Sequence, residues 1–223
     1  MVQENPAHVS DRFIIDGGDV IQNLYPTPIY SAKVDNLDPI QEEMFSALEK
    51  TNFEMNPCWA SHYLSDVFFR LNVVKEHQLN LFVSELAKHI QNYCNYLNYT
   101  GDCQISDSWF SLFRKGNYGH IHHHGATDIS GVYYIKTNGE DGNLFFETPN
   151  QHLGTSKVFS TLTPRHEYKP EVGNIMLFPG WLMHGIQTNT TDNERISLSF
   201  NISFFKSGGL PSNTNINSIL CDK

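Results

Sequence analysis

The segment Arg195-Ile-Ser-Leu-Ser-Phe-Asn-Ile-Ser-Phe-Phe205 decides the fold class of this chain of 223 residues. From Ile196 to Phe204 every second residue is apolar, and the residues between them are polar. Successive side chains of a β-strand point to opposite faces, so the alternation predicts a long strand with one face on a hydrophobic core. Arg195 and Ser197 then project from the same polar face.

The sequence before this strand, back to Gly101, is a series of short apolar or alternating runs. Gly, Asn, Asp and Pro separate the runs, as is typical of turns between strands. Seven strands within about a hundred residues favour a sandwich or jelly roll. The predicted strands span residues 108–114, 129–136, 143–147, 157–162, 174–178, 184–188 and 195–205.

The N-terminal part of the chain has a different periodicity. Residues 38–51 and 76–98 carry apolar side chains at intervals of three and four, which predicts amphipathic helices. We therefore expect a mainly β protein with flanking α, in which a helical support at 24–100 braces a β core at 106–206. No repeat or linker divides the chain, so we expect 1–223 to form a single domain, with 1–12 a flexible N-terminus.

Composition and charge limit the partners. The chain has 24 acidic and 15 basic residues, a formal charge of −9, and no basic cluster. Nucleic acid is therefore not an expected partner, because binding it needs a basic face. The apolar runs are too short to span a membrane and residues 1–10 lack an apolar signal core, so we expect a cytoplasmic protein without a membrane partner. The four cysteines lack paired spacing and are expected to be free thiols.

Four of the eleven histidines fall within Gly119-His-Ile-His-His-His-Gly125. In an extended segment residues i and i+2 share a face, so His122 and His124 can converge on one ion while His123 points away. His120 has the same parity and could donate to a ligand from outside the metal site. Alone, the H-x-H pair is also compatible with a polar loop that binds no metal.

A third histidine completes the candidate metal site. His184 opens a predicted strand after a buried run and a tight turn, a position that a barrel can bring beside His122 and His124. By itself, His184 also fits a hydrogen-bonded core residue. Three neutral imidazoles on one face of a cavity would hold a metal ion and leave up to three coordination positions open, as activation of O₂ requires.

Arg195 and Ser197 form a candidate carboxylate site. A guanidinium offers a planar fork that fits a carboxylate, and a hydroxyl two residues on can add a further hydrogen bond. A dicarboxylate lying between the metal and this pair would be held at both ends. The alternative is that Arg195 pairs with Glu194 or another surface acid.

These residues, in this order over about 106–205, resemble the 2-oxoglutarate/Fe(II)-dependent oxygenases, in particular the prolyl-hydroxylase-like branch. Gly116 stands six residues before His122, as in that branch, and Arg195-Ile-Ser197 is similar to its oxoglutarate-binding R-x-S. Together with Leu24-Tyr-Pro-Thr-Pro-Ile29, the motifs resemble an uncharacterised subfamily of marine bacteria and phages. Further segments that resemble the branch are Ser130-Gly-Val-Tyr-Tyr-Ile135, Gly142-Asn-Leu-Phe-Phe-Glu147 and Gly173 to His184.

The resemblance implies a double-stranded β-helix, the cupin-like form of the jelly roll, and an enzyme. Such an enzyme binds Fe(II), takes 2-oxoglutarate as cosubstrate and uses O₂. It couples the decarboxylation of 2-oxoglutarate to succinate with oxidation, by hydroxylation, of a substrate. The resemblance assigns the metal to His122, His124 and His184, and the distal carboxylate to Arg195 and Ser197. The substrate can be a small molecule or a peptide, since no binding signature precedes the β core.

Two departures from the family pattern bear on the chemistry. The superfamily's metal motif is H-x-D or H-x-E, and His124 takes the place of that carboxylate, which raises the charge of the site by one. The tyrosine that often helps to bind oxoglutarate, three residues before Gly116, is Phe113 in this chain. Tyr118 or Tyr134 could take over some of its role.

Two other functions remain open from the sequence. Gly116-x5-His122-x-His124-x3-Asp128 also resembles the first motif of the cupins, which would make Asp128 a fourth ligand in a dioxygenase or isomerase that does not use 2-oxoglutarate. That alternative gives Arg195 no role, and Asp128 also fits a turn before the next strand. The third possibility is a non-catalytic jelly-roll module that binds a ligand and would tolerate loss of His184.

Overall fold

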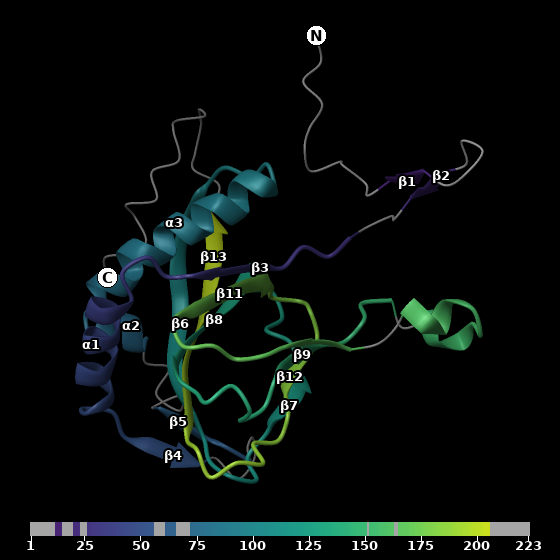
Figure 1. Cartoon of the computed structure of the whole chain (residues 1–223). Helices are drawn as coiled ribbons and strands as arrows, with labels where there is room; N and C mark the ends of the chain where they lie inside the picture. The colour runs from purple at the N-terminus through teal and green to yellow at the C-terminus, as the bar shows by residue number, and fades with distance from the viewer. Residues whose placement is uncertain are drawn as a thin grey trace.

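The computed structural model of the chain describes residues 12–14, 20–22, 26–55, 61–65, 72–150, 152–162 and 165–205. Its largest element is a seven-stranded antiparallel sheet in the order β3-β11-β8-β13-β6-β5-β4 (Figure 1). In that order the strands are Tyr30–Lys33, Asn174–Pro179, Ile129–Lys136, Arg195–Phe205, Asp102–Phe113, Tyr63–Ser65 and Phe53–Met55.

Strand β13 lies at the centre of this sheet, and its alternating sequence forms the predicted strand. It pairs with β6 on one side and with β8 on the other, antiparallel in both cases. The side chains of Leu198, Phe200 and Ile202 are completely buried on one face, in the core beneath the helices. The polar face is buried as well: Arg195 and Asn201 are almost inaccessible to solvent and line an internal cavity.

A smaller sheet of four strands, in the order β10-β9-β12-β7, lies opposite the large sheet (Figure 1). Its strands are His166–Tyr168, Leu144–Phe146, His184–Ile186 and Gly119–His122. An apolar cluster of Val132, Tyr134, Leu144, Phe146, Met176, Phe178 and Leu182 lies between the sheets. Two facing antiparallel sheets around this cluster form the double-stranded β-helix, so the predicted fold class is confirmed.

The helices cover the outer face of the large sheet (Figure 1). They are α1 (Leu37–Leu48), α2 (Val73–Glu76) and α3 (Asn80–Tyr96). The ring of Phe82 on α3 packs 5.3 Å from that of Tyr133 on β8 and 5.7 Å from that of Phe200 on β13. This contact packs α3 on the outer face of the large sheet. The opposite face of the sheet is therefore free to line the cavity.

The helix predicted over 76–98 is divided in two. Gln78 has a φ of 52°, in the left-handed region, where a right-handed helix cannot continue. Helix α2 therefore ends at Glu76 and α3 begins at Asn80. Asn98, with a φ of 51°, lies in the same conformation beyond the end of α3.

The strand predicted over 157–162 is wrong. This segment forms the 3₁₀ helix η4 (Phe159–Leu162), which follows η3 (Leu153–Thr155). The hydroxyls of Ser160 and Thr161 donate to carbonyls three residues earlier, so the segment satisfies backbone groups locally rather than in a ladder. Its apolar side chains Val158 and Leu162 are exposed, which an alternating strand in the core would not allow.

Several strands were not predicted. One is β10, a short, mostly exposed strand at the edge of the small sheet. Strand β7 was expected only as the extended segment that carries His122, because its histidines interrupt the apolar alternation. The segment predicted as a helical support also supplies β3, β4 and β5 to the large sheet. Near the N-terminus, β1 (Arg12–Ile14) and β2 (Val20–Gln22) form a separate pair.

The predictions for the cysteines, the N-terminus and membrane-spanning segments can be compared with the structure only in part. Cys94 and Cys103 are free and buried, whereas Cys58 and Cys221 lie outside the described residues. Residues 1–11 of the predicted flexible N-terminus also lie outside them, and the single-domain organisation stays a prediction. Among the described residues, no helix is long and apolar enough to cross a membrane.

Candidate metal centre

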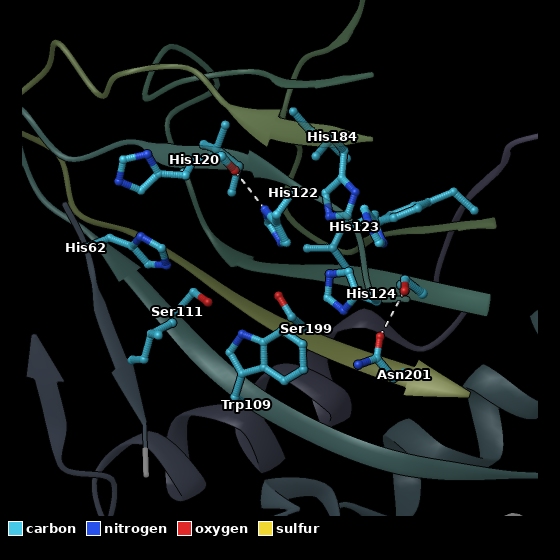
Figure 2. Close-up of a pocket in the computed structure, with 18 of the residues that line it drawn as sticks. His62, Trp109, Ser111, His120, His122, His123, His124, His184, Ser199 and Asn201 are labelled. Carbon is cyan, nitrogen blue, oxygen red and sulfur yellow. Dashed lines mark hydrogen bonds between the residues drawn. The ribbon is translucent and has the colours of Figure 1, made fainter. Parts of the chain in front are cut away.

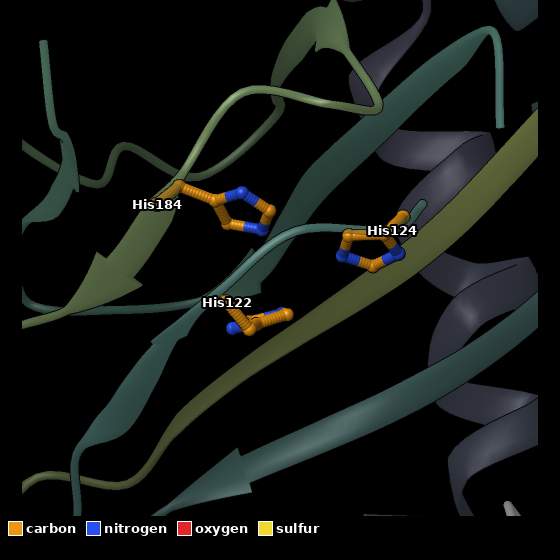
Figure 3. Close-up of side chains that lie close together, drawn as sticks. All are labelled: His122, His124 and His184. Carbon is orange, nitrogen blue, oxygen red and sulfur yellow. The ribbon is translucent and has the colours of Figure 1, made fainter. Parts of the chain in front are cut away.

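His122, His124 and His184 lie together at the wall of the cavity (Figure 3). His122 ends β7 and is the cross-strand partner of His184, which begins β12. His124 lies just beyond β7, where its backbone N–H donates to the carbonyl of Gly180 at 2.8 Å. One possible ligand atom from each histidine lies within 4.8 Å of the other two. No other such group of three was found in the part of the chain that the structure describes.

Hydrogen bonds orient two of the three imidazoles. Nδ1 of His122 lies 2.7 Å from the carbonyl oxygen of His120, and Nδ1 of His184 lies 2.8 Å from that of Leu182. A carbonyl oxygen only accepts, so each Nδ1 carries the proton and each Nε2 keeps its lone pair for a metal ion. His120, which was expected as a donor from outside the metal site, contacts His122 as an acceptor through its backbone carbonyl.

Burial keeps the three imidazoles neutral at pH 7. Together with the smaller effect of the neighbouring His122, it lowers the pKa of His184 to about 3 and that of His124 to about 4. The pKa of His122 is also lowered, again chiefly by burial. Neutral imidazole is the form that binds metal, so the site does not have to lose protons before an ion binds at neutral pH.

Two nearby residues lie outside the triad. His123 is exposed, and its Nδ1 accepts a hydrogen bond from the backbone N–H of Gly125. Asp128 is exposed too, and its carboxylate accepts a hydrogen bond of 2.8 Å from the backbone N–H of Phe204. The cupin alternative therefore lacks its fourth ligand, and Asp128 holds the turn before β8 against β13.

Arg195 is completely buried at the cavity. Its Nη1 donates to the carbonyl of Gly142 at 2.7 Å, whereas Nε and Nη2 are buried with no hydrogen-bond partner within the described structure. The guanidinium carbon lies 4.9 Å from the ring centre of Phe113 and 5.3 Å from that of Tyr134. A buried cation with unused donors is costly unless an anion accepts from it, so this corner of the cavity fits a carboxylate.

The surface pairing considered for Arg195 does not occur. Glu194 accepts from Arg114 at 3.0 Å and lies 3.6 Å from Lys136, on the outside of the sheet. The acid whose charge acts on Arg195 is the buried Asp141, and no salt bridge joins the two. Thr137, Asn138 and Asn193 donate to the Asp141 carboxylate instead.

Tyr134 and Ser197 lie beside this corner. The hydroxyl of Tyr134 is buried and has no hydrogen-bond partner among the described residues. Ser197 is 1% exposed and pairs with Tyr134 on β8 and with Ser111 on β6, both of which line the cavity. It therefore shares the face of Arg195, as predicted. Tyr118, the other candidate for the missing tyrosine, is 39% exposed.

The triad and Arg195 line one cavity of about 720 Å³. Its floor is formed by alternate residues of β6 and β13, among them Trp109 and Ser199, and its roof by the small sheet that carries His122 and His184 (Figure 2). The volume is in the range of small-molecule sites. A metal ion, a five-carbon dicarboxylate and part of a further ligand can share it.

His62 also lines the cavity, and the sequence did not point to it. Its ring stacks on Phe113, with ring centres 4.2 Å apart and planes 10° apart, and its Nδ1 lies 3.2 Å from the carbonyl of Tyr118. Burial lowers its pKa to about 4, so the ring is neutral at pH 7. His62 lies some sixty residues before the H-x-H motif, in a segment with no recognisable spacing, so only the folded chain brings it to the site.

Comparison with protein families finds one match. Residues 107–201 match the family described as putative 2OG-Fe(II) oxygenase. The matched region runs from β6 to β13 and contains the triad and Arg195. No curated protein matches the sequence.

Three solved structures with a similar fold are distant from this chain in sequence. A prolyl-4-hydroxylase from Pseudomonas putida has a TM-score of 0.55 and 11% identity, over 81% of this chain and 94% of that one. An oxidoreductase of the 2OG-Fe(II) oxygenase family from Burkholderia pseudomallei has a TM-score of 0.55 and 12% identity, over 73% and 77%. HygX from Streptomyces hygroscopicus, with nickel, 2-oxoglutarate and hygromycin B bound, has a TM-score of 0.51 and 12% identity, over 79% and 82%. At such identities the likeness establishes a common fold.

Proposed function

We propose that this chain, whose residues 107–201 match the family described as putative 2OG-Fe(II) oxygenase, is a hydroxylase that binds Fe(II) through His122, His124 and His184. Its cosubstrate is 2-oxoglutarate, with the distal carboxylate on Arg195 and Ser197. The observation that carries the proposal is the buried guanidinium of Arg195, whose Nε and Nη2 have no acceptor, in the same cavity as three neutral histidines.

The residues of the cavity have separate tasks in this reaction. The three imidazoles would hold the metal by Nε2, with the Nδ1 hydrogen bonds of His122 and His184 fixing their rings. Arg195 would bind the distal carboxylate through its two free donors, and the Tyr134 hydroxyl lies where it could donate a further hydrogen bond. When bound, the iron would supply the oxidising chemistry with O₂ and 2-oxoglutarate.

The cavity also controls access of water. Apolar side chains of the cluster between the two sheets, including Val132, Leu144 and Phe178, line the cavity beside the polar groups. They lower the local dielectric, which strengthens the attraction between Arg195 and a carboxylate.

The remaining space of the cavity would receive the substrate. We propose a small molecule or a peptide, because the cavity is closed in by both sheets and leaves room beyond a metal-bound dicarboxylate for only part of a ligand. A formal charge of −9 gives no support to nucleic acid as a substrate. We expect the protein to act in the cytoplasm.

A calorimetric titration of the Mn(II)-loaded protein with 2-oxoglutarate tests the proposal. The parent chain is compared with Arg195→Lys, which keeps the positive charge but lacks the planar guanidinium that can donate two hydrogen bonds to one carboxylate. We expect the affinity to fall about ten- to a hundredfold, since loss of a charge-assisted hydrogen bond costs about 1.5–3 kcal/mol. Succinate formed from 2-oxoglutarate with Fe(II) in air is measured alongside.

The matched control is Arg114→Lys, because Arg114 is an exposed arginine whose partner is Glu194. Its affinity for 2-oxoglutarate is expected to equal that of the parent chain. Failure of the metal-loaded parent to bind 2-oxoglutarate would reject the proposed function. Equal affinity in the parent and in Arg195→Lys would reject the role of Arg195.

A further inference from the structure

The charges that line the cavity are few and lie at different places. Among the described residues that line it, Arg195 is the only arginine or lysine and Asp107 the only acid. The three potential metal ligands are all neutral. If a divalent metal ion binds there and 2-oxoglutarate chelates it through one carboxylate, the metal end of the cavity keeps one uncompensated positive charge. The other carboxylate is matched by Arg195 at its own end.

Asp107 lies at the metal end. It is on β6, where its register partner on β13 is Asn201, whereas Arg195 pairs with Phe113, six residues further along β6. Trp109, two residues from Asp107 on the same face of β6, stacks on His124 with ring centres 5.7 Å apart and planes 14° apart. Figure 2 shows His124, Trp109 and Asn201 on one side of the cavity and His62 on the other.

A hydrogen-bond network holds the Asp107 carboxylate in place. Nδ2 of Asn201 donates to Oδ1 of Asp107 at 3.2 Å, and the Ser130 hydroxyl lies 2.9 Å from Oδ1 of Asn201. Asn201 is 5% exposed and Ser130 1%, whereas Asp107 is partly buried, so the network runs from the buried end of the cavity toward its edge. Ser106 donates to the other carboxylate oxygen. These partners are neutral, and no salt bridge within the described residues involves Asp107.

His124 is the ligand that this network reaches. Asp107 and His124 both line this end of the cavity, and Trp109, the next residue on the Asp107 face of β6, packs on the His124 ring. Figure 2 shows Asn201, whose amide donates to the Asp107 carboxylate, beside His124. A negative charge at this end of the cavity will stabilise a positive metal ion bound to His124, because opposite charges attract more strongly where apolar side chains exclude water.

We propose that Asp107 supplies the negative charge that the three-histidine site lacks. Its carboxylate would act from beside His124, without itself coordinating the metal ion. This inference rests on the metal site of the proposed function, but not on 2-oxoglutarate or on any substrate. Asp107 is thus a positioning residue that raises the affinity of the triad for a divalent ion. Asn201 holds its carboxylate toward His124.

Co(II) titration of the metal-free protein, followed by the visible absorption of the bound ion, tests the proposal. Asp107→Asn keeps the size of the side chain and an oxygen for Asn201, but removes the charge. We expect it to weaken Co(II) binding about ten- to a hundredfold, the usual effect of changing a residue behind a metal ligand. Asp107→Glu is expected to restore most of the affinity.

The control for a general effect of charge is Asp192→Asn, which removes one acid from the surface, where its partner is Lys115. Its Co(II) affinity is expected to match that of the parent chain. An affinity for Co(II) in Asp107→Asn within twofold of the parent would overturn the proposal. Because no 2-oxoglutarate is present, failure of the proposed cosubstrate to bind would leave this result unaffected.

A second parent, the His124→Asp variant, separates an effect of the Asp107 charge from an effect of Asp107 on the shape of the metal site. In His124→Asp the ligand itself carries a negative charge, so Asp107→Asn is expected to weaken Co(II) binding much less than in the parent chain. Such non-additivity is expected only where two residues supply the same interaction. An equal loss of affinity in both backgrounds would mean that Asp107 acts through the shape of the site, and would also overturn the proposal.

Discussion

At the scale of single residues, the cavity holds polar groups that the protein itself does not satisfy. The Tyr134 hydroxyl and two nitrogens of Arg195 are buried without hydrogen-bond partners among the described residues. Buried polar groups are normally paired, so exceptions need a reason. A bound dicarboxylate would satisfy these groups together.

Replacing Tyr134 tests this reasoning directly. We expect Tyr134→Phe to weaken 2-oxoglutarate binding about tenfold, because a hydrogen bond to a charged group contributes about 1.5 kcal/mol or more. The free energy of unfolding should stay the same or rise slightly, since the hydroxyl has no protein partner to lose. Calorimetry and urea unfolding measure the two quantities. Tyr118→Phe, at an exposed position, is the control, and a larger loss of affinity there would assign the contact to Tyr118 instead.

How far the sequence predicts the site depends on the distance between residues along the chain. His122 and His124 follow from the two-residue repeat of a strand, and Arg195 and Ser197 from the alternation in β13. His62 and Asp107 were not predicted. Asp107 has the parity of Trp109 on β6, but a single acid near the start of a strand has no signature. Its place beside His124 depends on the pairing of β6 with β13, which one sequence does not reveal.

At the scale of elements, the turn between β11 and β12 fixes two of the three histidines. Gly180 accepts from the backbone N–H of His124 and donates to the carbonyl of Asp128, and His184 begins β12 four residues later. A Cβ atom at Gly180 would overlap the carbonyl of Thr127. The turn can therefore lie against the H-x-H segment only because it has no side chain there.

Gly180→Ala should separate the turn from this segment. We expect the free energy of unfolding to fall by about 1–3 kcal/mol, as in other overpacked sites, and Co(II) binding to weaken several-fold because His124 and His184 move apart. Urea unfolding and Co(II) titration measure the two effects. Gly154→Ala, where a Cβ would meet no atom within 4 Å, is the control. Unchanged values in Gly180→Ala would show that the turn does not position the triad.

The elements themselves were predicted where one face of each is apolar. Strand β13 and strand β8 match their predicted ranges, α3 lies within its predicted helix, and α1 begins one residue before its own. The errors fall where local chemistry hides or replaces that pattern. Histidines replace apolar residues in β7, and hydroxyl groups favour a 3₁₀ helix at Phe159–Leu162 over the predicted strand.

At the scale of the whole molecule, the histidines that are neutral in the folded protein make its stability depend on pH. The pKa of His184 is about 3 when folded and returns to its ordinary value of 6.5 when the chain unfolds. Between these two values the unfolded chain binds a proton that the folded protein does not. The stability that His184 contributes is therefore present above about pH 6.5 and is lost as the pH falls toward 3.

We expect the urea midpoint of the metal-free protein to decrease as the pH is lowered from 6.5 to 4.5. For a fully buried histidine the loss is at most about 1.4 kcal/mol per pH unit. His184→Gln should flatten this dependence, because glutamine does not titrate. Parallel curves for the two proteins across this range would contradict the assigned pKa of His184.

The central claim is that the three histidines and Arg195 bind Fe(II) and 2-oxoglutarate in one cavity. The most direct test is an anaerobic titration of the Fe(II)-loaded protein with 2-oxoglutarate, followed by the visible charge-transfer absorption of the iron chelate. The account predicts an absorption band in the parent chain, a weaker one in Arg195→Ala at the same 2-oxoglutarate concentration, and none in His184→Ala. Absence of the band from a parent chain that holds iron, or an unchanged band in His184→Ala, would contradict it.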